Sequence, residues 1–492
     1  MAQLRFLGVS DLHSGAAASL ATHLADDGRD TVPGTTSAVA AAFGLAVRAL
    51  LTRHNQQYFG QAKADDRAPT VILLGDALDL AFSDRADAAT CYLSWLRGLT
   101  GGETGYFAPD MVMLPGNHDH SLWTGARLAA EAGALAQGGD AALARATPAL
   151  TGHGLPGPMM TALNRRAGFS GSVTLRYPNF ALYDKARDRA VILHHGHFID
   201  ATYRAMTSLN DLLTGCPRPD VSAADLADEN ANWIDFGWSS FGQASNLSRD
   251  VVTLYSGLAV GSEAHHLRQR MARGIANQLA PHLPMGGQDR LKTLLRHGVL
   301  GALDATMGAY ADEDRIGVSE ALSPGGIAGL RGYIDGPATR QLTDELGARP
   351  DDLTFVFGHT HKPFVDTLVP DRSYPVIQVG NTGGWYLDSP RLNGREGAAL
   401  LLIDAELNVV LLHCFATPVN GVAMTPEVRL VSRPDEGAEA FAAEIAGFVA
   451  ADPAIWQALS ATAAREYEVR QNMILDLLDA SDHRALQSGG VM

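Results

Sequence analysis

The sequence predicts an α/β fold whose strands alternate with helices in the first and last thirds of the chain. Three observations support this prediction. Short apolar runs are bounded by Gly, Pro or Asp, and segments with helical spacing lie between several of them. In the middle of the chain, apolar and polar residues show almost no alternation of period two, which indicates a mostly helical insertion. The chain has 492 residues, of which 46% are hydrophobic and 19% charged. At about 150 residues per domain, this is typical of an ordered globular protein with roughly three domain-sized units.

The predicted strands are apolar runs of the length expected for buried strands. They are Leu4–Val9, Thr70–Leu74, Met111–Leu114, Ala190–Leu193, Leu353–Phe357, Val376–Val379, Ala398–Ile403 and Val409–Leu412. Helical spacing follows the first run at Ser37–Tyr58 and the second at Ala86–Leu99. Strands and helices that alternate in this way predict a layered sheet or an α/β sandwich.

We divide the chain into four segments. Residues 1–199 and 350–432 form the two parts of a core, and residues 200–349 form a helical cap insertion between them. Residues 433–492 form a helical C-terminal extension. The insertion has helical spacing at Ser262–Leu279 and at Gln288–Leu303. The C-terminal extension predicts two helices separated near Asp452-Pro453, an arrangement compatible with a homo-oligomer.

Charge and composition exclude several classes of protein. Lys and Arg number 38 against 54 Asp and Glu, so the net charge is −16, and without a basic run this disfavours nucleic acid as a partner. No apolar run approaches the roughly 18 residues that span a bilayer. Residues 1–10 lead straight into a polar motif, which leaves no room for a cleaved signal and predicts a cytoplasmic protein. Cys91, Cys216 and Cys414 are odd in number and far apart, which predicts reduced thiols.

Five polar clusters each follow a predicted strand, where α/β proteins place their sites. They are Asp11-Leu12-His13, Gly75-Asp76-Ala77-Leu78-Asp79, Gly116-Asn117-His118-Asp119, His194-His195-Gly196-His197 and Gly358-His359-Thr360-His361. Each alone has a structural interpretation, such as a helix cap or a turn. Together they supply the carboxylate, imidazole and amide groups that borderline divalent metals accept, in a number that predicts two metals sharing a bridging carboxylate.

The ordered set Asp-x-His, Gly-Asp-x-x-Asp, Gly-Asn-His-Asp, His and Gly-His-x-His resembles the calcineurin-like metallophosphoesterase superfamily, over roughly residues 1–199 and 350–430. The resemblance implies a four-layer α/β/β/α sandwich and a binuclear phosphohydrolase. In that family a metal-bridging hydroxide attacks a phosphodiester or pyrophosphate bond. Mn²⁺ is the leading cofactor, with Fe or Zn as alternatives, because carboxylate, amide and imidazole ligands suit all three.

The resemblance also implies a role for individual residues. One metal would be held by Asp11, His13, Asp76 and His361, and the second by Asp76, Asn117, His195 and His359, with Asp76 as the bridge. His195 is favoured over His194 because it directly precedes Gly196, as in the family's His-Gly variants.

Two further site residues follow from the resemblance. His118 matches the residue that protonates the leaving group, and Asp79 matches the acidic residue that orients it. His197 is expected beside a ligand or facing the substrate, and His120 either near the site or in a structural role.

Positions at which the sequence differs from the family's motifs narrow the class of enzyme. Ala81 and Phe82 stand where the protein Ser/Thr phosphatases carry Arg, and Asp119 ends the third block where they have Glu, which disfavours a protein phosphatase. A helical insertion before Gly-His-Thr-His is similar to that of bacterial UDP-diacylglucosamine pyrophosphatases, although those have Arg at the position of His118.

The expected substrate is a small phosphate ester or pyrophosphate chosen by the cap. The alternatives are a phosphomonoesterase or nuclease of the same superfamily, whereas a non-catalytic scaffold is disfavoured because every ligand position is present.

Overall fold

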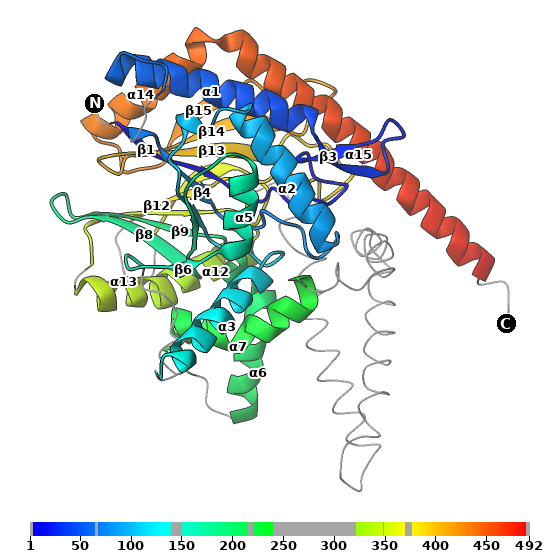
Figure 1. The fold of residues 1–492 in the computed structure, drawn as a ribbon. Coiled ribbons are helices and arrows are strands. Elements are labelled where there is room, and N and C mark those ends of the chain that lie inside the picture. Colours follow the sequence, from blue (N-terminus) through cyan, green and yellow to red (C-terminus); the bar gives the residue numbers. More distant parts are fainter. Residues whose placement is uncertain are drawn as a thin grey trace, which may run out of the picture.

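The computed structural model describes residues 3–63, 67–138, 150–214, 218, 220–239, 321–347, 349–369 and 376–488. It has a mixed α/β fold with two main sheets and helices around them (Figure 1), so the predicted α/β class is confirmed. Two predicted helices of the insertion, Ser262–Leu279 and Gln288–Leu303, lie outside the described residues, as does Cys216.

The larger sheet has 8 strands in the order β15-β14-β13-β1-β4-β5-β7-β6. Its centre is parallel, from β1 (Leu4–Val9) through β4 (Thr70–Leu73) and β5 (Met111–Met113) to β7 (Val173–Leu175). The remaining strands are antiparallel to their neighbours: β6 (Leu155–Pro156), β13 (Gly397–Asp404), β14 (Val409–Ala416) and β15 (Glu427–Leu430). The carboxyl ends of β1, β4 and β5 therefore lie at one edge.

The second sheet has 5 strands in the order β11-β12-β10-β9-β8. β9 (Arg189–His194), β10 (Asp352–Phe357) and β12 (Ile377–Asn381) are parallel. The edge strands β8 (Asn179–Asp184) and β11 (Phe364–Leu368) are antiparallel to them. A 2-stranded sheet joins β2 (Thr22–Leu24) to β3 (Thr31–Thr36).

Every predicted strand overlaps a strand of the structure. The strands that the sequence analysis did not predict are β2, β3, β6, β7, β8, β11 and β15. They are mostly edge strands or short, and β3 contains Pro33 and Gly34, which weaken any strand pattern.

Apolar side chains from both sheets share one buried cluster. Ile72 and Leu114 contribute from the larger sheet, and Val191, Leu193 and Val356 from the smaller one. The alternate residues of β9, Ala190 and Ile192, belong to the main core on the opposite face. Because these strands are buried on both faces, they read in the sequence as unbroken apolar runs.

Helices cover the outer side of each sheet (Figure 1). α1 (Ala38–Phe59) and α2 (Arg85–Thr100) begin at the capping residues Ser37 and Asp84 and lie with the C-terminal helices on the larger sheet. On the smaller sheet, Tyr333 at the end of α12 (Pro324–Tyr333) contacts Phe355 and donates a hydrogen bond to Asn179. The other described helices of the core are η2 (Thr104–Tyr106), α3 (Ser121–Ala136), α5 (Pro158–Arg166) and η3 (His197–Ile199).

The described flanks of the predicted insertion are helical. The first flank contains η4 (Ala201–Arg204), α6 (Ala205–Thr214), α7 (Ala223–Ile234) and the π-helical turn η5 (Asp235–Ser239). The second contains α12, the π-helical turn η9 (Ile334–Ala338) and α13 (Thr339–Leu346). Within the described residues, no helix is long and apolar enough to cross a membrane.

The C-terminal extension forms two helices, α14 (Glu436–Ala451) and α15 (Pro453–Ser488), separated at Asp452 as predicted. Arg470 of α15 is fully buried. Its guanidinium donates hydrogen bonds to the carbonyls of Ser19 and Thr22 at 2.7–3.0 Å, and Ser19 Oγ donates to the carbonyl of Leu12 at 2.5 Å. Arg470 thus links α15 to the loop that follows β1.

We expect Arg470→Ala to lower the free energy of unfolding by about 3 kcal/mol, because it removes the buried guanidinium that donates to the carbonyls of Ser19 and Thr22 and to the Glu466 carboxylate. Urea denaturation measures this loss. The matched variant Arg465→Ala removes an exposed guanidinium from the same helix and should stay within about 0.5 kcal/mol of the parent. Equal effects of the two substitutions would contradict the anchoring role.

Candidate metal centre

The polar clusters meet where the carboxyl ends of β1, β4 and β5 approach those of β9 and β10. Backbone hydrogen bonds join their loops: the Asp11 N–H donates to Gly75 O at 3.0 Å, His13 N–H to Asp76 O at 2.8 Å, and Gly358 N–H to His195 O at 2.7 Å. The sequence places polar residues after each strand, and the two sheets bring those strand ends together.

The backbone at this junction is strained. Five of the predicted ligands have left-handed φ values, which non-glycine residues seldom adopt: Asp11 (52°), His13 (46°), Asp76 (49°), His359 (73°) and His361 (58°). Such conformations persist only where the surrounding structure enforces them, and they concentrate at functional sites.

Two glycines of the motifs leave room for the functional side chains. A Cβ on Gly116 would lie 2.2 Å from Asp76 Oδ1, and one on Gly75 would lie 2.2 Å from His195 Nδ1. Any larger residue at either position would displace Asp76 or His195. The need for this space explains why the second and third polar clusters each begin with glycine.

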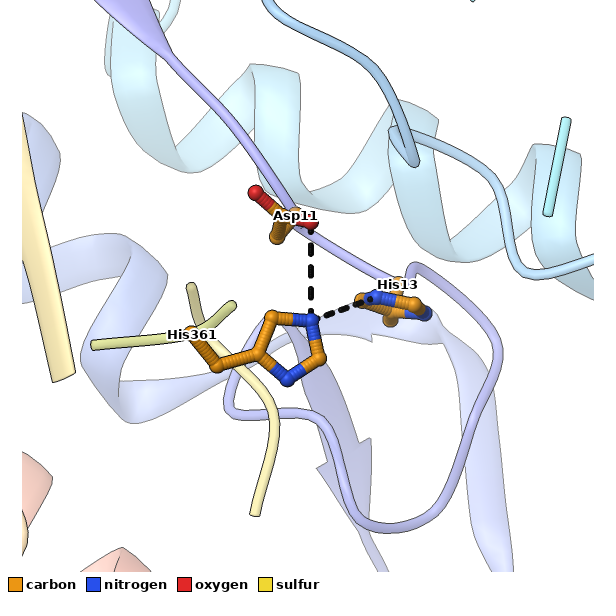
Figure 2. Close-up of side chains that lie close together, drawn as sticks. All are labelled: Asp11, His13 and His361. Atoms are coloured by element: carbon orange, nitrogen blue, oxygen red, sulfur yellow. Dashed lines mark hydrogen bonds and ion pairs between the residues drawn. The ribbon is translucent and has the colours of Figure 1, made fainter. Parts of the chain in front are cut away.

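Asp11, His13 and His361 form the first group of potential ligands, shown in Figure 2. His361 Nε2 lies 3.5 Å from Asp11 Oδ1 and 3.1 Å from His13 Nε2. All three side chains are buried. The group therefore presents two imidazole nitrogens and one carboxylate oxygen to a common point.

The other nitrogens of these imidazoles are held by carboxylates. His13 Nδ1 lies 2.9 Å from Asp79 Oδ2, and His361 Nδ1 lies 2.7 Å from Asp388 Oδ2. A carboxylate acceptor keeps the hydrogen on Nδ1, so each Nε2 atom carries a lone pair. The two lone pairs point at each other unless a proton or a cation lies between them.

His195 belongs to a second group with Asp11 and Asp76. Its Nδ1 donates to Leu74 O at 2.8 Å, and its Nε2 lies 3.3 Å from Asp76 Oδ2 and 3.1 Å from Asn117 Oδ1. The Nε2 atom therefore faces the oxygen atoms of two predicted ligands.

Asp76 lies between the two groups. Its Oδ1 accepts the His118 N–H at 2.7 Å, whereas its buried Oδ2 has no hydrogen-bond partner among the described residues. That oxygen lies 3.6 Å from His13 Nε2 and 3.3 Å from His195 Nε2. A buried carboxylate oxygen without a donor is costly unless a cation is near it.

The electrostatics of the centre favour positive charge. Burial depresses the pKa of His195, but Asp76 and Asp11 outweigh it and raise the pKa to about 9. Burial also opposes protonation of His361, while Asp388 and Asp11 raise its pKa to about 9. The carboxylates thus attract cationic charge, either as protons on these imidazoles or as bound metal ions.

Asp79 contacts two histidines at once. Its Oδ2 faces His13 Nδ1, and its Oδ1 lies 3.2 Å from His118 Nδ1 while accepting the N–H groups of Ala81 and Phe82. Despite burial, His118 and His13 hold the pKa of Asp79 well below its usual value, so it is ionised. His13, Asp79 and His118 also lie close enough together to hold a metal ion. In this structure the Asp79 carboxylate orients the imidazoles of His13 and His118.

His359 lies at the margin of the centre. Its backbone N–H donates to both carboxylate oxygens of Asp11, at 3.1 and 2.9 Å. Its ring centroid lies 5.3 Å from that of His195 and 5.3 Å from that of Tyr203. The structure therefore places His359 beside His195, although its ring belongs to neither group of potential ligands described above.

Three neighbouring histidines lie outside these groups. His194 packs on Tyr333 with ring centroids 4.6 Å apart, and burial lowers its pKa well below the usual value. His197 Nε2 lies 2.9 Å from the Tyr177 hydroxyl, and His120 Nδ1 lies 2.9 Å from Asp235 Oδ1. Of the adjacent pair His194 and His195, the structure brings His195 to Asp76.

Two carboxylates that organise the centre, Asp119 and Asp388, were given no role from the sequence. Asp119 accepts the N–H groups of Gly116, Ala77 and Leu78 and so ties the second polar cluster to the third. Asp388 contacts His361 from 27 positions away. Asp119 stands within a recognised motif, but no pattern in the sequence links Asp388 to the Gly-His-Thr-His cluster.

We expect Asp388→Ala to weaken metal binding by about 10–100-fold, because a partner that orients a ligating imidazole has effects of this size. Calorimetric titration of the metal-free protein with Mn²⁺ measures the change. Asp366→Ala, which removes an exposed carboxylate on β11, is the matched control and should bind like the parent. Unchanged affinity in Asp388→Ala would show that His361 needs no such support.

No protein-family model matches this chain, and no curated protein is significantly similar to it in sequence. The case for a function therefore depends on the residues and geometry of the centre.

Proposed function

We propose that this protein is a binuclear metal-dependent phosphohydrolase of the calcineurin-like metallophosphoesterase superfamily, cleaving a phosphodiester or pyrophosphate bond. One observation carries the proposal: the buried Asp76 Oδ2 lies between His13 Nε2 and His195 Nε2, as a bridging ligand would. The two sheets with a shared core and outer helices also fit the four-layer sandwich expected for that superfamily.

The donor set suits two divalent cations. One would be held by Asp11, His13, Asp76 and His361, and the other by Asp76, Asn117, His195 and His359. Oxygen and imidazole ligands without thiolate favour Mn²⁺, with Fe or Zn as alternatives. Such ions provide a nucleophilic water at neutral pH and neutralise the charge on the phosphoryl oxygens.

His118 is proposed to protonate the leaving oxygen. Because Asp79 engages Nδ1 of His118, the proton that moves is the one on Nε2, and the ionised carboxylate stabilises the imidazolium before transfer. The His118 N–H is bonded to Asp76 Oδ1, so the acid and the bridging carboxylate are fixed to each other. This proton transfer matters most for a diester or a pyrophosphate with a poor leaving group.

The insertion is proposed to select the substrate. A cavity of about 100 Å³ beside His359 is lined by Thr360 and Gly196 of the core and by Arg204 and Leu322 of the insertion. Since these flanks lie next to a predicted ligand, they are positioned to contact whatever substituent the phosphorus carries on that side.

The proposal is tested by turnover of bis(p-nitrophenyl) phosphate against p-nitrophenyl phosphate on protein loaded in turn with Mn²⁺, Zn²⁺ and Mg²⁺. We expect the diester to be preferred, with Mn²⁺ most effective and two ions bound per chain by elemental analysis. Preference for the monoester would indicate a phosphomonoesterase instead of a phosphodiesterase. No hydrolysis with any metal, together with fewer than two bound ions, would contradict the proposal.

A further inference from the structure

The cavity beside His359 has polar donors on both of its sides. The core contributes Gly196, His359 and Thr360 to its lining, and the insertion contributes Arg204 and the first turn of α12. Its volume is about 100 Å³. A single water needs only about 10–15 Å³, so the cavity has room for a group of several non-hydrogen atoms.

Two glycines set the shape of this cavity. Gly196 has a φ of 128°, and a Cβ on it would lie 2.7 Å from the Cβ of His359. A Cβ on Gly329 of α12 would lie 2.0 Å from the carbonyl oxygen of Ile199 in η3. The absence of these side chains leaves space next to the predicted ligand and lets α12 pack directly on η3.

Two side chains bring donors to the cavity. Thr360 is only 6% exposed, and its buried Oγ1 has no hydrogen-bond partner among the described residues. Arg204 brings a positive charge from the insertion. A guanidinium has five N–H donors, so Arg204 can bind an anion and still donate to the carbonyl of Ile199, which lies 3.5 Å from its Nη2.

The N-terminus of α12 adds a backbone donor. The N–H groups in the first turn of a helix have no acceptor within the helix, and they carry its positive partial charge. Ser323 Oγ accepts the N–H of Gly326 at 3.0 Å, and Pro324 has no N–H. The N–H of Gly325, which lines the cavity, is thus left for another acceptor. Helix N-termini bind phosphate through such groups.

One carboxylate in the lining opposes an anion. Asp200 also borders the cavity, and its Oδ1 accepts the N–H of Thr202 at 2.7 Å, which caps η4. We therefore expect an anion to lie toward Thr360, Arg204 and the N-terminus of α12.

We propose that this cavity binds a second phosphate group of the substrate, carried by the substituent that phosphorus retains. The inference rests on the proposed function, in which His118 protonates the leaving group. His118 contacts His13, with ring centroids 4.5 Å apart, whereas the cavity borders His359, which lies beside His195. The leaving group departs on the side of His118, so the group that reaches the cavity belongs to the part that stays on phosphorus.

The kinetic test uses p-nitrophenyl alkyl phosphates, which share one leaving group and differ in the retained substituent. Esters with a terminal phosphonate on a chain of two, three or four carbons are each compared with the plain alkyl ester of the same chain. In the Mn²⁺-loaded parent protein, kcat/KM should favour the phosphonate ester by about 10–100-fold at the chain length that reaches the cavity, because charge-assisted hydrogen bonds are strong.

Two variants assign this preference to the cavity. Arg204→Gln and Thr360→Val should each lower the ratio of the paired kcat/KM values by about tenfold, since each removes a donor to the anion. Arg331→Gln removes an exposed guanidinium from the same helix α12 and should keep the ratio of the parent.

A binding measurement adds a readout that needs no turnover. Inorganic phosphate is titrated into the metal-free protein, in which no bound ion can hold it, and phosphorus NMR follows the binding. The parent and Arg331→Gln should bind phosphate alike, and Arg204→Gln should bind it about tenfold more weakly.

The outcomes separate this inference from the proposed function. Equal kcat/KM for the paired esters at every chain length would overturn the phosphate site and leave the phosphohydrolase intact. A preference that Arg204→Gln and Thr360→Val both leave unchanged would overturn it as well. Hydrolysis of none of the esters would contradict the proposed function, whereas phosphate binding that Arg204→Gln weakens would still support an anion site in this cavity.

Discussion

Asp76→Asn is expected to reduce phosphodiester hydrolysis by about 10³-fold or more and to lower the number of bound ions per chain from two to one. The substitution keeps the shape of the side chain but removes the charge of the oxygen that lies between His13 and His195. The stabilisation that metal ions give a phosphoryl transfer is worth several kcal/mol, and each 1.36 kcal/mol is tenfold in rate.

Two measurements separate this effect from misfolding. Circular dichroism and thermal unfolding report whether Asp76→Asn retains the fold, and elemental analysis after gel filtration gives the number of bound ions. Asp26→Asn, at an exposed carboxylate, controls for the loss of one negative charge and should behave like the parent. Full activity and two bound ions in Asp76→Asn would show that Asp76 is not the bridge.

His118→Asn is expected to slow the hydrolysis of diesters with poor leaving groups by about 10²–10⁴-fold, the usual contribution of a general acid. The loss should shrink as the leaving group improves, because a p-nitrophenolate departs without a proton. The number of bound ions should stay at two, since His118 is not assigned as a ligand.

A series of aryl methyl phosphates with rising leaving-group acidity measures this dependence. A steeper plot of log kcat against leaving-group acidity in His118→Asn than in the parent would identify the acid. His120→Asn is the matched control, because it removes an imidazole two positions away that contacts Asp235 instead. A uniform loss across the whole series would assign His118 to binding and not to proton transfer.

The strands that carry the candidate site were predictable because both of their faces are largely buried. β1, β4, β5, β9 and β10 are short apolar runs, and a polar cluster follows each of them directly. Strands such as β11 lack that signal, because the adjacent residues Asp366 and Thr367 point to opposite faces and both are exposed. Local sequence therefore revealed the central strands more readily than the edges.

The sequence by itself predicted the central strands and the C-terminal helices, because each depends on local composition and spacing. It indicated the candidate ligands through the resemblance of its motifs to a known superfamily. Tertiary structure decided the rest. His194 and His195 are adjacent and chemically identical, and only the packing of β9 turns His195 toward Asp76 and His194 toward Tyr333. Asp388 reaches His361, and Tyr386 reaches His13, because the segment after β12 passes the ends of both sheets. Contacts between segments so far apart arise from chain topology, which no local pattern encodes.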